Sequence, residues 1–347
     1  MLTLNLYRKN RFLTLLLAVG LLFALSGCNQ PTDTPPLPTA LPTEIPPATE
    51  TSAEPTAPPP KLVLVDPGNQ AGDEILSFLN SVANEEGLTL ETSTSPELPP
   101  HGQETKVVVF LAQPANLVEI VSASPSTQFI VSGDFEVQAM PNLSVIRTAG
   151  EDLAFMGGFL TMQIAWDWRA GALIPSDIVK AAEKANAFEN GARYVCGQCT
   201  PYYAPIVYFP LIGQAPAQVG ETGWDAQITN FAQHYVNSYF VDPAIATPQI
   251  LERLKGLEEY INNDVNLIGS TLSSAESFTA LLGFDILPAL EQVMPQALSG
   301  AGGQIVNARV KIVVNNNDQV VTLAKTDNFN RVAADLAAGI IIPLSIP

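Results

Sequence analysis

Apolar residues follow two alternating patterns along the chain from residue 61 to about residue 170. Short apolar runs rich in β-branched residues, of which residues 61–66 (KLVLVD) are the first, predict buried strands. Between the runs, apolar residues recur at helical spacing, and the first such segment is followed by Gly87, a suitable helix end. The pattern predicts strands at residues 61–66, 88–91, 106–111, 128–131 and 143–146, and helices at residues 73–86, 115–122 and 151–166.

A second round of the same alternation begins at Gly171. It predicts strands at residues 172–174, 205–209, 239–241 and 265–268, helices at residues 178–194, 225–236, 249–262, 284–298 and 328–338, and a β-hairpin from residues 309–314 and 319–323. Strands that alternate with helices favour parallel sheets covered on both faces. We therefore expect an α/β fold of two Rossmann-like lobes with mostly parallel sheets. The lobes are residues 61–170 and 171–347, and the last stretch crosses back to the first lobe.

The N-terminal segment has the three parts of an export signal. Residues 7–11 (YRKNR) are basic, and residues 12–25 form an apolar stretch of about 14 residues, shorter than the ~20 that span a bilayer. The stretch ends in LSGC at residues 25–28, which resembles the bacterial lipobox. We expect residues 1–27 to be a cleaved signal peptide and Cys28 to carry the lipid that anchors the chain on the extracytoplasmic face of the cell membrane. A plain signal peptide with a chance cysteine, or an uncleaved anchor, is the alternative.

The composition changes abruptly after the cysteine. Residues 29–60 contain 11 prolines and 7 threonines and few residues that could form a core. A proline-rich chain is extended and semi-rigid at roughly 3.1 Å per residue, so this segment could hold a domain up to ~100 Å from a bilayer. We expect residues 28–60 to be a lipidated cysteine followed by a disordered Pro/Thr-rich linker.

The acidic charge of the chain narrows the partners it could have. The formal net charge is −18, and removing the three cations of the predicted signal leaves 13 basic against 34 acidic residues. Nucleic-acid binding is excluded because it needs clustered Lys and Arg. No P-loop, HExxH or GxSxG segment occurs, so we expect neither an enzyme nor a cofactor. The two histidines, His101 and His234, lack the spacing of metal ligands, and no metal site is expected.

Polar side chains follow several of the predicted strands. In open α/β sheets, ligands bind at the carboxyl ends of the strands, where loop amides and helix N-termini point. The candidate ligand contacts share this position, and they are Asp66, Asn69, Gln70, Asp134, Phe135 and Asp242. Carboxylates and amides suit sugar or ribose hydroxyls, and a phenyl ring can stack on a ligand ring. The carboxylate of Asp66 could instead form an Asx turn or a helix cap. Tyr202, Tyr203 and Trp224 are further candidates for the wall of the cleft.

Two cysteines form the sharpest local motif, Cys196-Gly197-Gln198-Cys199. A CxxC pair can hold a reactive thiolate, but that motif normally follows a strand and opens a helix. Here it closes a predicted helix and precedes a predicted strand. A small structural disulfide between Cys196 and Cys199 is therefore the favoured interpretation, in keeping with an oxidising location. A redox pair is the alternative.

Several short segments, weak one by one, occur in an order and spacing that resemble a known family. They are residues 129–134 (FIVSGD), 142–145 (NLSV), 151–159 (EDLAFMGGF), 188–193 (FENGAR), 266–269 (NLIG) and 338–343 (AGIIIP). Together with the lipobox they resemble the basic membrane protein family of ABC-transporter substrate-binding lipoproteins. The resemblance spans most of residues 61–347 and implies the type I periplasmic-binding-protein fold.

Two segments depart from the family pattern. The first strand of the family is usually followed by an aromatic residue that stacks on a purine nucleoside, but residues 66–73 (DPGNQAGD) contain none. The Ser/Lys stretch of the family is also missing, and residues 280–284 (ALLGF) stand in its place. A fold tolerates such changes better than a ligand specificity does.

The resemblance implies a binding protein whose two lobes close on a small polar solute, nucleoside-like or other, and pass it to an ABC permease. Closure of this kind is a hinge motion stabilised by contacts from both lobes. Two alternatives stay open. One is a cell-surface sensor or receptor on the same fold, and the other is a thiol oxidoreductase that uses the CGQC motif.

Overall fold

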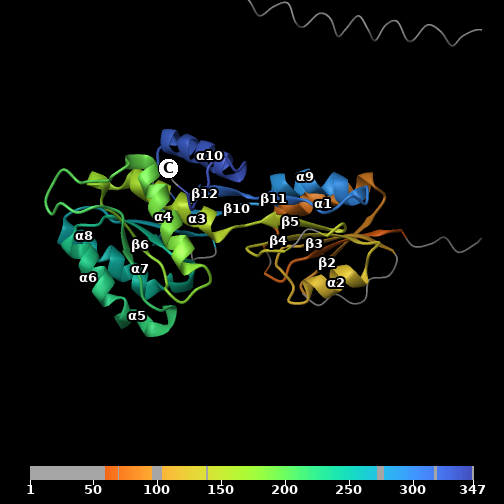
Figure 1. Ribbon diagram of the computed structural model, residues 1–347, viewed down its shortest axis with the longest axis horizontal. Coiled ribbons are helices and arrows are strands. Elements are labelled where there is room, and N and C mark those ends of the chain that lie inside the picture. Colours follow the sequence, from red (N-terminus) through yellow and green to blue (C-terminus); the bar gives the residue numbers. More distant parts are fainter. Residues whose placement is uncertain are drawn as a thin grey trace, which may run out of the picture. The chain divides into compact units, whose positions relative to one another are not determined.

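The computed structural model describes residues 59–68, 70–95, 104–137, 140–271, 277–315 and 319–345 (Figure 1). Two six-stranded sheets, each with helices on both faces, form the compact unit Ala57–Pro347. This confirms the expected α/β fold with two mostly parallel sheets. The predicted signal peptide, Cys28, most of the linker and Asn69 lie outside the described residues.

The first sheet is parallel throughout, in the order β11-β5-β4-β3-β1-β2. Its strands are β1 Lys61–Val65, β2 Thr89–Ser93, β3 Thr105–Phe110, β4 Gln128–Gly133, β5 Leu143–Arg147 and β11 Ile305–Asn307. Helices α1 (Asp73–Glu85) and α9 (Leu287–Leu298) cover one face, and α2 (Leu117–Ala123) covers the other (Figure 1). Coverage on both faces explains why the central strands are continuous apolar runs and do not alternate with polar residues.

The second sheet has the order β12-β10-β9-β8-β6-β7 and is parallel except for β12, which runs antiparallel to β10. Its strands are β6 Ala170–Leu173, β7 Leu211–Gly213, β8 Ser238–Val241, β9 Asn266–Ser270, β10 Ala280–Asp285 and β12 Arg309–Val314. Helices α3 (Gly150–Ile164), α4 (Ala181–Cys196) and α10 (Leu323–Ala337) share the core on one face. The other face is covered by α6 (Asp225–Gln233), α7 (Pro248–Lys255) and α8 (Leu257–Ile261).

Helices α3 and α4 touch backbone to backbone. A β-carbon on Gly158 would lie 1.9 Å from the carbonyl oxygen of Phe188, and one on Gly191 would lie 1.9 Å from that of Phe155. Glycine at both positions is therefore what permits this approach. Helix α3 also contacts β6, β8, β9 and β10, so it belongs with the second sheet although it precedes residue 170. The expected division at residues 170 and 171 differs from these contacts. Helix α3 is apolar nearly all round, so its sequence gave no indication of the sheet that it covers.

The chain passes between the two sheets three times. It goes from β5 to α3, from β10 to α9, and from β11 to β12. Helix α9 and strand β11 therefore complete the first sheet, while the elements before and after them belong to the second. Neither sheet is built from one continuous stretch of sequence.

Three predicted elements are wrong. Residues 205–209 are not a strand, because Pro205 and Pro210 lack the amide a sheet needs, and β7 begins after them at Leu211. Strand β12 pairs with β10 and not with residues 319–323, where α10 begins. Strand β10 was not predicted, because its last residues, Phe284 and Asp285, were assigned to the helix predicted at residues 284–298. The long helix predicted at 249–262 is two helices, α7 and α8, divided at Gly256.

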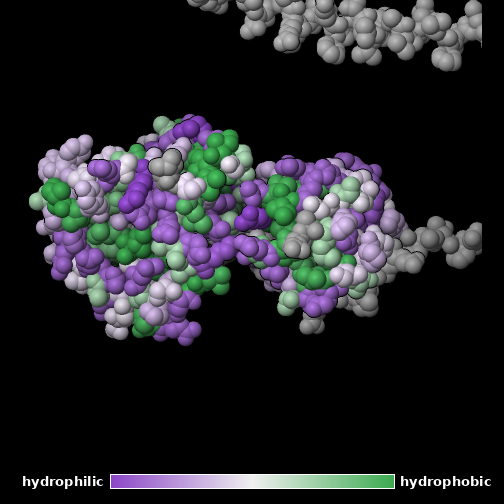
Figure 2. Space-filling model, viewed as in Figure 1, coloured by the Kyte–Doolittle hydropathy of each residue, from purple (hydrophilic) through white to green (hydrophobic). Residues whose placement is uncertain are grey.

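The surface mixes hydrophilic and hydrophobic residues. Figure 2 shows hydrophilic residues over most of this face, with hydrophobic residues in separate patches between them. Among the helices that the structure describes, none combines the length and the apolar character needed to cross a bilayer.

Candidate functional site

Asp66 lies directly after β1, at the carboxyl end of the first sheet, and its side chain is buried. Its two carboxylate oxygens accept hydrogen bonds from the backbone N–H groups of Gln70 and Ala71, both at 2.8 Å. The carboxylate thus shapes the loop that leads into α1. This is the local role that the sequence left open as an alternative to ligand contact.

The other candidates near this edge are in different situations. The side chain of Gln70 is exposed, and Asn69 lies outside the described residues. Phe135 is half-buried and packs against the core beneath β4. The phenyl ring is therefore held by the protein, which limits its freedom to stack on a ligand.

Asp134 follows β4 and links the first sheet to helices of the second. One carboxylate oxygen accepts a hydrogen bond from the N–H of Gly150 at 3.0 Å, at the first residue of α3. The other lies 3.1 Å from Nζ of Lys180, the residue before α4, and the same ammonium lies 3.3 Å from Glu151. A helix N-terminus attracts anions, so Asp134 itself occupies the place that an anionic ligand would take.

Lys184 joins this group from the first turn of α4. A β-carbon on Gly150 would lie 2.7 Å from Cε of Lys184 and 2.9 Å from Oδ2 of Asp134, so both side chains crowd the same glycine. We call Asp134, Glu151, Asp152, Lys180 and Lys184 the charged cluster. It lies where β4 ends and where α3 and α4 begin, so it is drawn from the elements of both sheets.

Within the charged cluster, the pKa values of Asp152 and Lys180 are shifted. Burial, followed by the neighbouring charge of Glu151, raises the pKa of Asp152 to about 7, and Arg147 opposes the shift. For Lys180, burial opposes the charged form, but hydrogen bonds and charges from Asp134 and Glu151 outweigh it, so its pKa is raised. The cluster therefore favours the charged form of Lys180 and, compared with a free carboxyl group, the protonated form of Asp152.

Asp242 follows β8 at the carboxyl end of the second sheet and is buried. Its carboxylate accepts a hydrogen bond from the N–H of Ala244 at 3.0 Å and caps the short 3-10 turn Pro243–Ile245. Burial raises the pKa of Asp242, while this hydrogen bond and the charge of Lys184 oppose the shift. The influence of Lys184 connects Asp242 electrostatically to the charged cluster.

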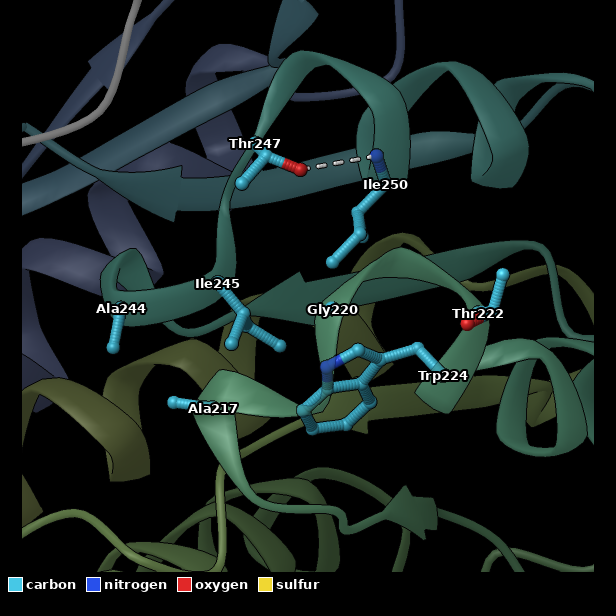
Figure 3. Close-up of a pocket in the computed structure, with 8 residues that line it drawn as sticks. All are labelled: Ala217, Gly220, Thr222, Trp224, Ala244, Ile245, Thr247 and Ile250. Carbon is cyan, nitrogen blue, oxygen red and sulfur yellow. Dashed lines mark hydrogen bonds between the residues drawn. The ribbon is translucent and has the colours of Figure 1, made fainter.

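A cavity of about 350 Å³ lies beside this edge, between the segments that follow β7 and β8 (Figure 3). It is lined by Ala217, Gly220, Thr222, Trp224, Ala244, Ile245, Thr247 and Ile250. Thr247 accepts a hydrogen bond from Ile250 at the start of α7, and the indole ring of Trp224 forms part of the wall (Figure 3). Within the described part of the chain, the indole N–H of Trp224 has no hydrogen-bond partner. The cavity size is in the range of small-molecule sites, which run from roughly 300 to 1,000 Å³.

The structure separates the aromatic candidates. Trp224 borders the cavity, but Tyr202 and Tyr203 lie beside Trp166 and Arg169, which precede β6, at the amino end of the second sheet. The expectation that these two tyrosines line the cleft is therefore wrong: the loop that carries them precedes β7 and does not follow it.

Sequence reasoning missed the lysines of the charged cluster. Lys180 meets Asp134 across 46 positions, which no local pattern reveals. The sequence did offer one signal: basic residues are few, 16 in the whole chain, yet Lys180 and Lys184 are only four positions apart.

Cys196 and Cys199 form a disulfide, with Cα atoms 5.0 Å apart. Cys196 is the last residue of α4, and Cys199 is buried. The N–H of Phe209 donates to the carbonyl of Cys199 at 3.2 Å, so the bridge also fixes the loop before β7. In the described ranges, no group of three or more His, Cys, Asp or Glu side chains is placed to hold a metal ion.

No protein-family model matches the chain, and no curated protein sequence matches it. Solved structures do match. A solute-binding protein of an ABC transporter system from Conexibacter woesei DSM 14684 aligns with a TM-score of 0.54 and 13% identity over 83% of this chain and 98% of its own. A solute-binding protein of an ABC transporter system from Aeropyrum pernix K1 aligns with a TM-score of 0.52 and 12% identity over 82% of this chain and 93% of its own.

A transcriptional activator from Bacillus halodurans also aligns, with a TM-score of 0.50 and 10% identity over 82% of this chain and 100% of its own. At such low identities the likeness concerns the fold, and proteins of different function share it. The chain thus has the two-sheet α/β fold of periplasmic-binding-protein-like structures.

Proposed function

We propose that this chain is a membrane-anchored, extracytoplasmic solute-binding lipoprotein that captures a small polar solute and delivers it to an ABC permease. The single observation that carries the proposal is the charged cluster at the strand ends, where Asp134 of the first sheet meets Gly150 and Lys180 of the second. Two of the similar structures are named as solute-binding proteins of ABC transporters. The finer assignment, to the basic membrane protein family, rests on the ordered sequence segments.

The chemistry of the strand ends favours a hydroxyl-bearing solute over an anion. Asp66, Asp134 and Asp242 stand at the carboxyl ends of three strands. Each carboxylate already accepts at least one hydrogen bond from the protein, but two carboxylate oxygens can accept about four, and the remaining capacity suits hydroxyl donors. Asp134 already occupies the N-terminus of α3, where a phosphate or carboxylate would otherwise bind. Nucleosides and sugars are thus the first classes to test.

A thermal-shift screen of the purified chain against nucleosides, sugars and amino acids tests the proposal. A solute that binds only the folded state stabilises it by mass action and so raises Tm. At a free solute concentration of a hundred times Kd, the stabilisation is about 2.7 kcal/mol. We expect Asp134→Asn to weaken the binding of the identified solute about tenfold or more, since a charged hydrogen bond contributes roughly 1.5–3 kcal/mol.

Asp264→Asn is the matched control, because Asp264 is exposed and precedes β9 at the opposite edge of the second sheet. No stabilisation by any solute class, or equal affinity in Asp134→Asn and wild type, would contradict the assignment of the site.

The anchoring part of the proposal rests on Cys28. We expect mass spectrometry of the mature N-terminal peptide to show an acylated cysteine and no residues of the segment 1–27. In the Cys28→Ser variant, we expect the processed form of the chain to be absent from the membrane fraction. An unmodified Cys28 in the mature protein would overturn lipidation while leaving solute binding untouched.

The geometry of the CGQC segment argues against the thiol oxidoreductase alternative. Reactive CxxC thiolates are stabilised at a helix N-terminus, whereas Cys196 ends α4, where the helix dipole disfavours an anion. An insulin-reduction assay on the wild type and on Cys196→Ser tests this. We expect no catalysed reduction of insulin by either protein, and reduction by the wild type that is lost in Cys196→Ser would support a thiol oxidoreductase.

A further inference from the structure

Exposed aromatic side chains gather at the amino end of the second sheet, the edge opposite the candidate solute site. We define the aromatic platform as Trp166, Tyr202, Tyr203, Tyr235 and Tyr260. These side chains are 40% to 80% exposed, Tyr202 the most. Trp166 stacks on Tyr203 with ring centroids 5.6 Å apart and planes 8° apart, and Tyr235 stacks on Tyr260 at 6.3 Å and 23°. Large exposed aromatic groups in contact with one another mark an interaction surface.

A buried arginine joins the two stacked pairs. Arg169 is 1% exposed, and its guanidinium donates to the backbone carbonyls of Tyr203 and His234, at 2.5 and 2.7 Å. The guanidinium carbon also lies 5.8 Å from the ring centroids of Tyr235 and Phe209. One buried cation thus supports both halves of the aromatic platform from beneath.

Asp167 fixes the backbone that carries the two most exposed rings of the platform, Tyr202 and Tyr203. Its carboxylate accepts hydrogen bonds from the N–H groups of Tyr202 and Tyr203 at 2.6 and 3.2 Å, and it pairs with Arg169 at 3.2 Å. Asp167 has a φ of 53°, in the left-handed region. The hydrogen bonds and the ion pair of Asp167 hold this loop in one conformation. Burying the ion pair and keeping a residue in the left-handed region both cost free energy, so the protein keeps this conformation at some expense of stability.

The loop that carries Tyr202 and Tyr203 is uncharged, which favours a neutral partner for this half of the platform. In the other half, Tyr260 follows Glu258 and Glu259 in α8. The segment from Tyr194 to Gly220, which contains the loop, has no Asp, Glu, Lys or Arg, although the chain has a net charge of −18. An anionic bilayer is repelled by such a protein. Rigid Tyr and Trp rings combine an apolar face with a polar edge at low entropic cost, which suits a ring bearing hydroxyl groups.

We propose that the aromatic platform binds a neutral polysaccharide, with pyranose rings stacked on the exposed rings of Tyr202, Tyr203 and Trp166. The tyrosine hydroxyls then lie within the layer of sugar hydroxyls. This site is separate from solute capture, because the platform and the charged cluster lie at opposite ends of the second sheet's strands.

Cosedimentation of the full-length chain, solubilised in detergent, with cellulose, chitin and purified peptidoglycan sacculi tests the proposal. We expect saturable binding to cellulose or chitin, which are neutral. Binding to peptidoglycan sacculi alone, whose stem peptides carry carboxylates, would overturn the assignment to a neutral polysaccharide. The double variant Tyr202→Ala/Tyr203→Ala should lose about tenfold or more in affinity, since each aromatic contact is worth roughly a fewfold to tenfold in binding. Tyr202→Phe/Tyr203→Phe, which keeps both rings, should stay within about threefold of wild type.

Leu323→Ala is the matched control, because it removes an 84% exposed apolar side chain at the start of α10, outside the platform. If the double alanine variant does not fold, as judged by Tm, Tyr202→Ala alone replaces it. No binding to any glycan, or equal binding by wild type and the alanine variant, would overturn the proposal. Platform-dependent binding to phosphatidylglycerol vesicles in place of glycans would also overturn it and assign the surface to a membrane.

Discussion

Replacing Asp152 with asparagine should stabilise the protein at alkaline pH and leave it almost unchanged at acidic pH. Asp152 lies in the first turn of α3 and is buried, and burial raises its pKa from 3.8 to about 7. Between these two values the folded state holds a proton that the unfolded chain has released. Stability therefore falls as pH rises through this window, and the full penalty of the ionised, buried carboxylate is present above pH 7.

The size of the effect follows from the shift. Each pKa unit corresponds to about 1.36 kcal/mol, so the step from 3.8 to about 7 bounds the penalty at roughly 4 kcal/mol. Asparagine keeps the size of the side chain and carries no charge, but it loses a favourable interaction with the helix N-terminus worth about 0.3–1 kcal/mol. We expect Asp152→Asn to gain about 2–4 kcal/mol at about pH 8.5, which corresponds to a rise in Tm of several degrees.

Urea denaturation of the wild type and of Asp152→Asn at about pH 4.5 and about pH 8.5 measures this difference. The matched control is Asp73→Asn, the same exchange in the first turn of α1, where the side chain is exposed. Its stability should change by less than about 1 kcal/mol at both pH values. A gain for Asp152→Asn that is the same at both pH values, or a loss at about pH 8.5, would refute the reasoning.

Three further changes have defined outcomes. Gly158→Ala should destabilise the protein by about 1–3 kcal/mol or more, because the new methyl group meets the carbonyl of Phe188. Gly72→Ala is the control and should cost less than about 1 kcal/mol, because there is open space around Gly72. Equal losses of stability in urea denaturation would contradict the contact between α3 and α4. Cys196→Ser/Cys199→Ser should lower the free energy of unfolding by at most about 2 kcal/mol, since the bridge closes a short loop, and a loss above about 4 kcal/mol would show a wider role. Lys180→Gln should cost less than about 1 kcal/mol, because its ion pairs are partly exposed, and a larger loss in the same melts would mean that the charged cluster supports folding.

The order of strands and helices could be predicted from the sequence because buried parallel strands and amphipathic helices leave different spacings of apolar residues. Two of the failures have different physical causes. Strand β10 is an apolar run that leads directly into α9, so the change of period was hidden. The loop at residues 205–209 has the apolar composition of a strand, but its flanking prolines deny it a place in a sheet.

The candidate site was predictable only in part. A carboxylate directly after a buried strand was the correct signal for Asp66, Asp134 and Asp242 as residues of the strand ends. Sequence could not tell whether each carboxylate faces a ligand or the protein itself, because Asp66 and Asp242 bind amides of their own loops. The link from Asp134 to Lys180 depends on how α4 packs against α3, which is a property of the assembled fold.

The return of residues 287–307 to the first sheet has a consequence for biogenesis. In the export that we propose, the chain is threaded through a channel from its N-terminus and delivers β1 to β5 long before α9 and β11 arrive. During that interval Ile130 and Ile146 lack the cover that Leu290 and Val293 later supply, and β5 presents an unpaired edge. Nascent chains are therefore prone to aggregate until residues 287–307 have emerged. If export proceeds as proposed, holdase chaperones at the exit of the channel should crosslink to β5 in chains arrested before residue 287.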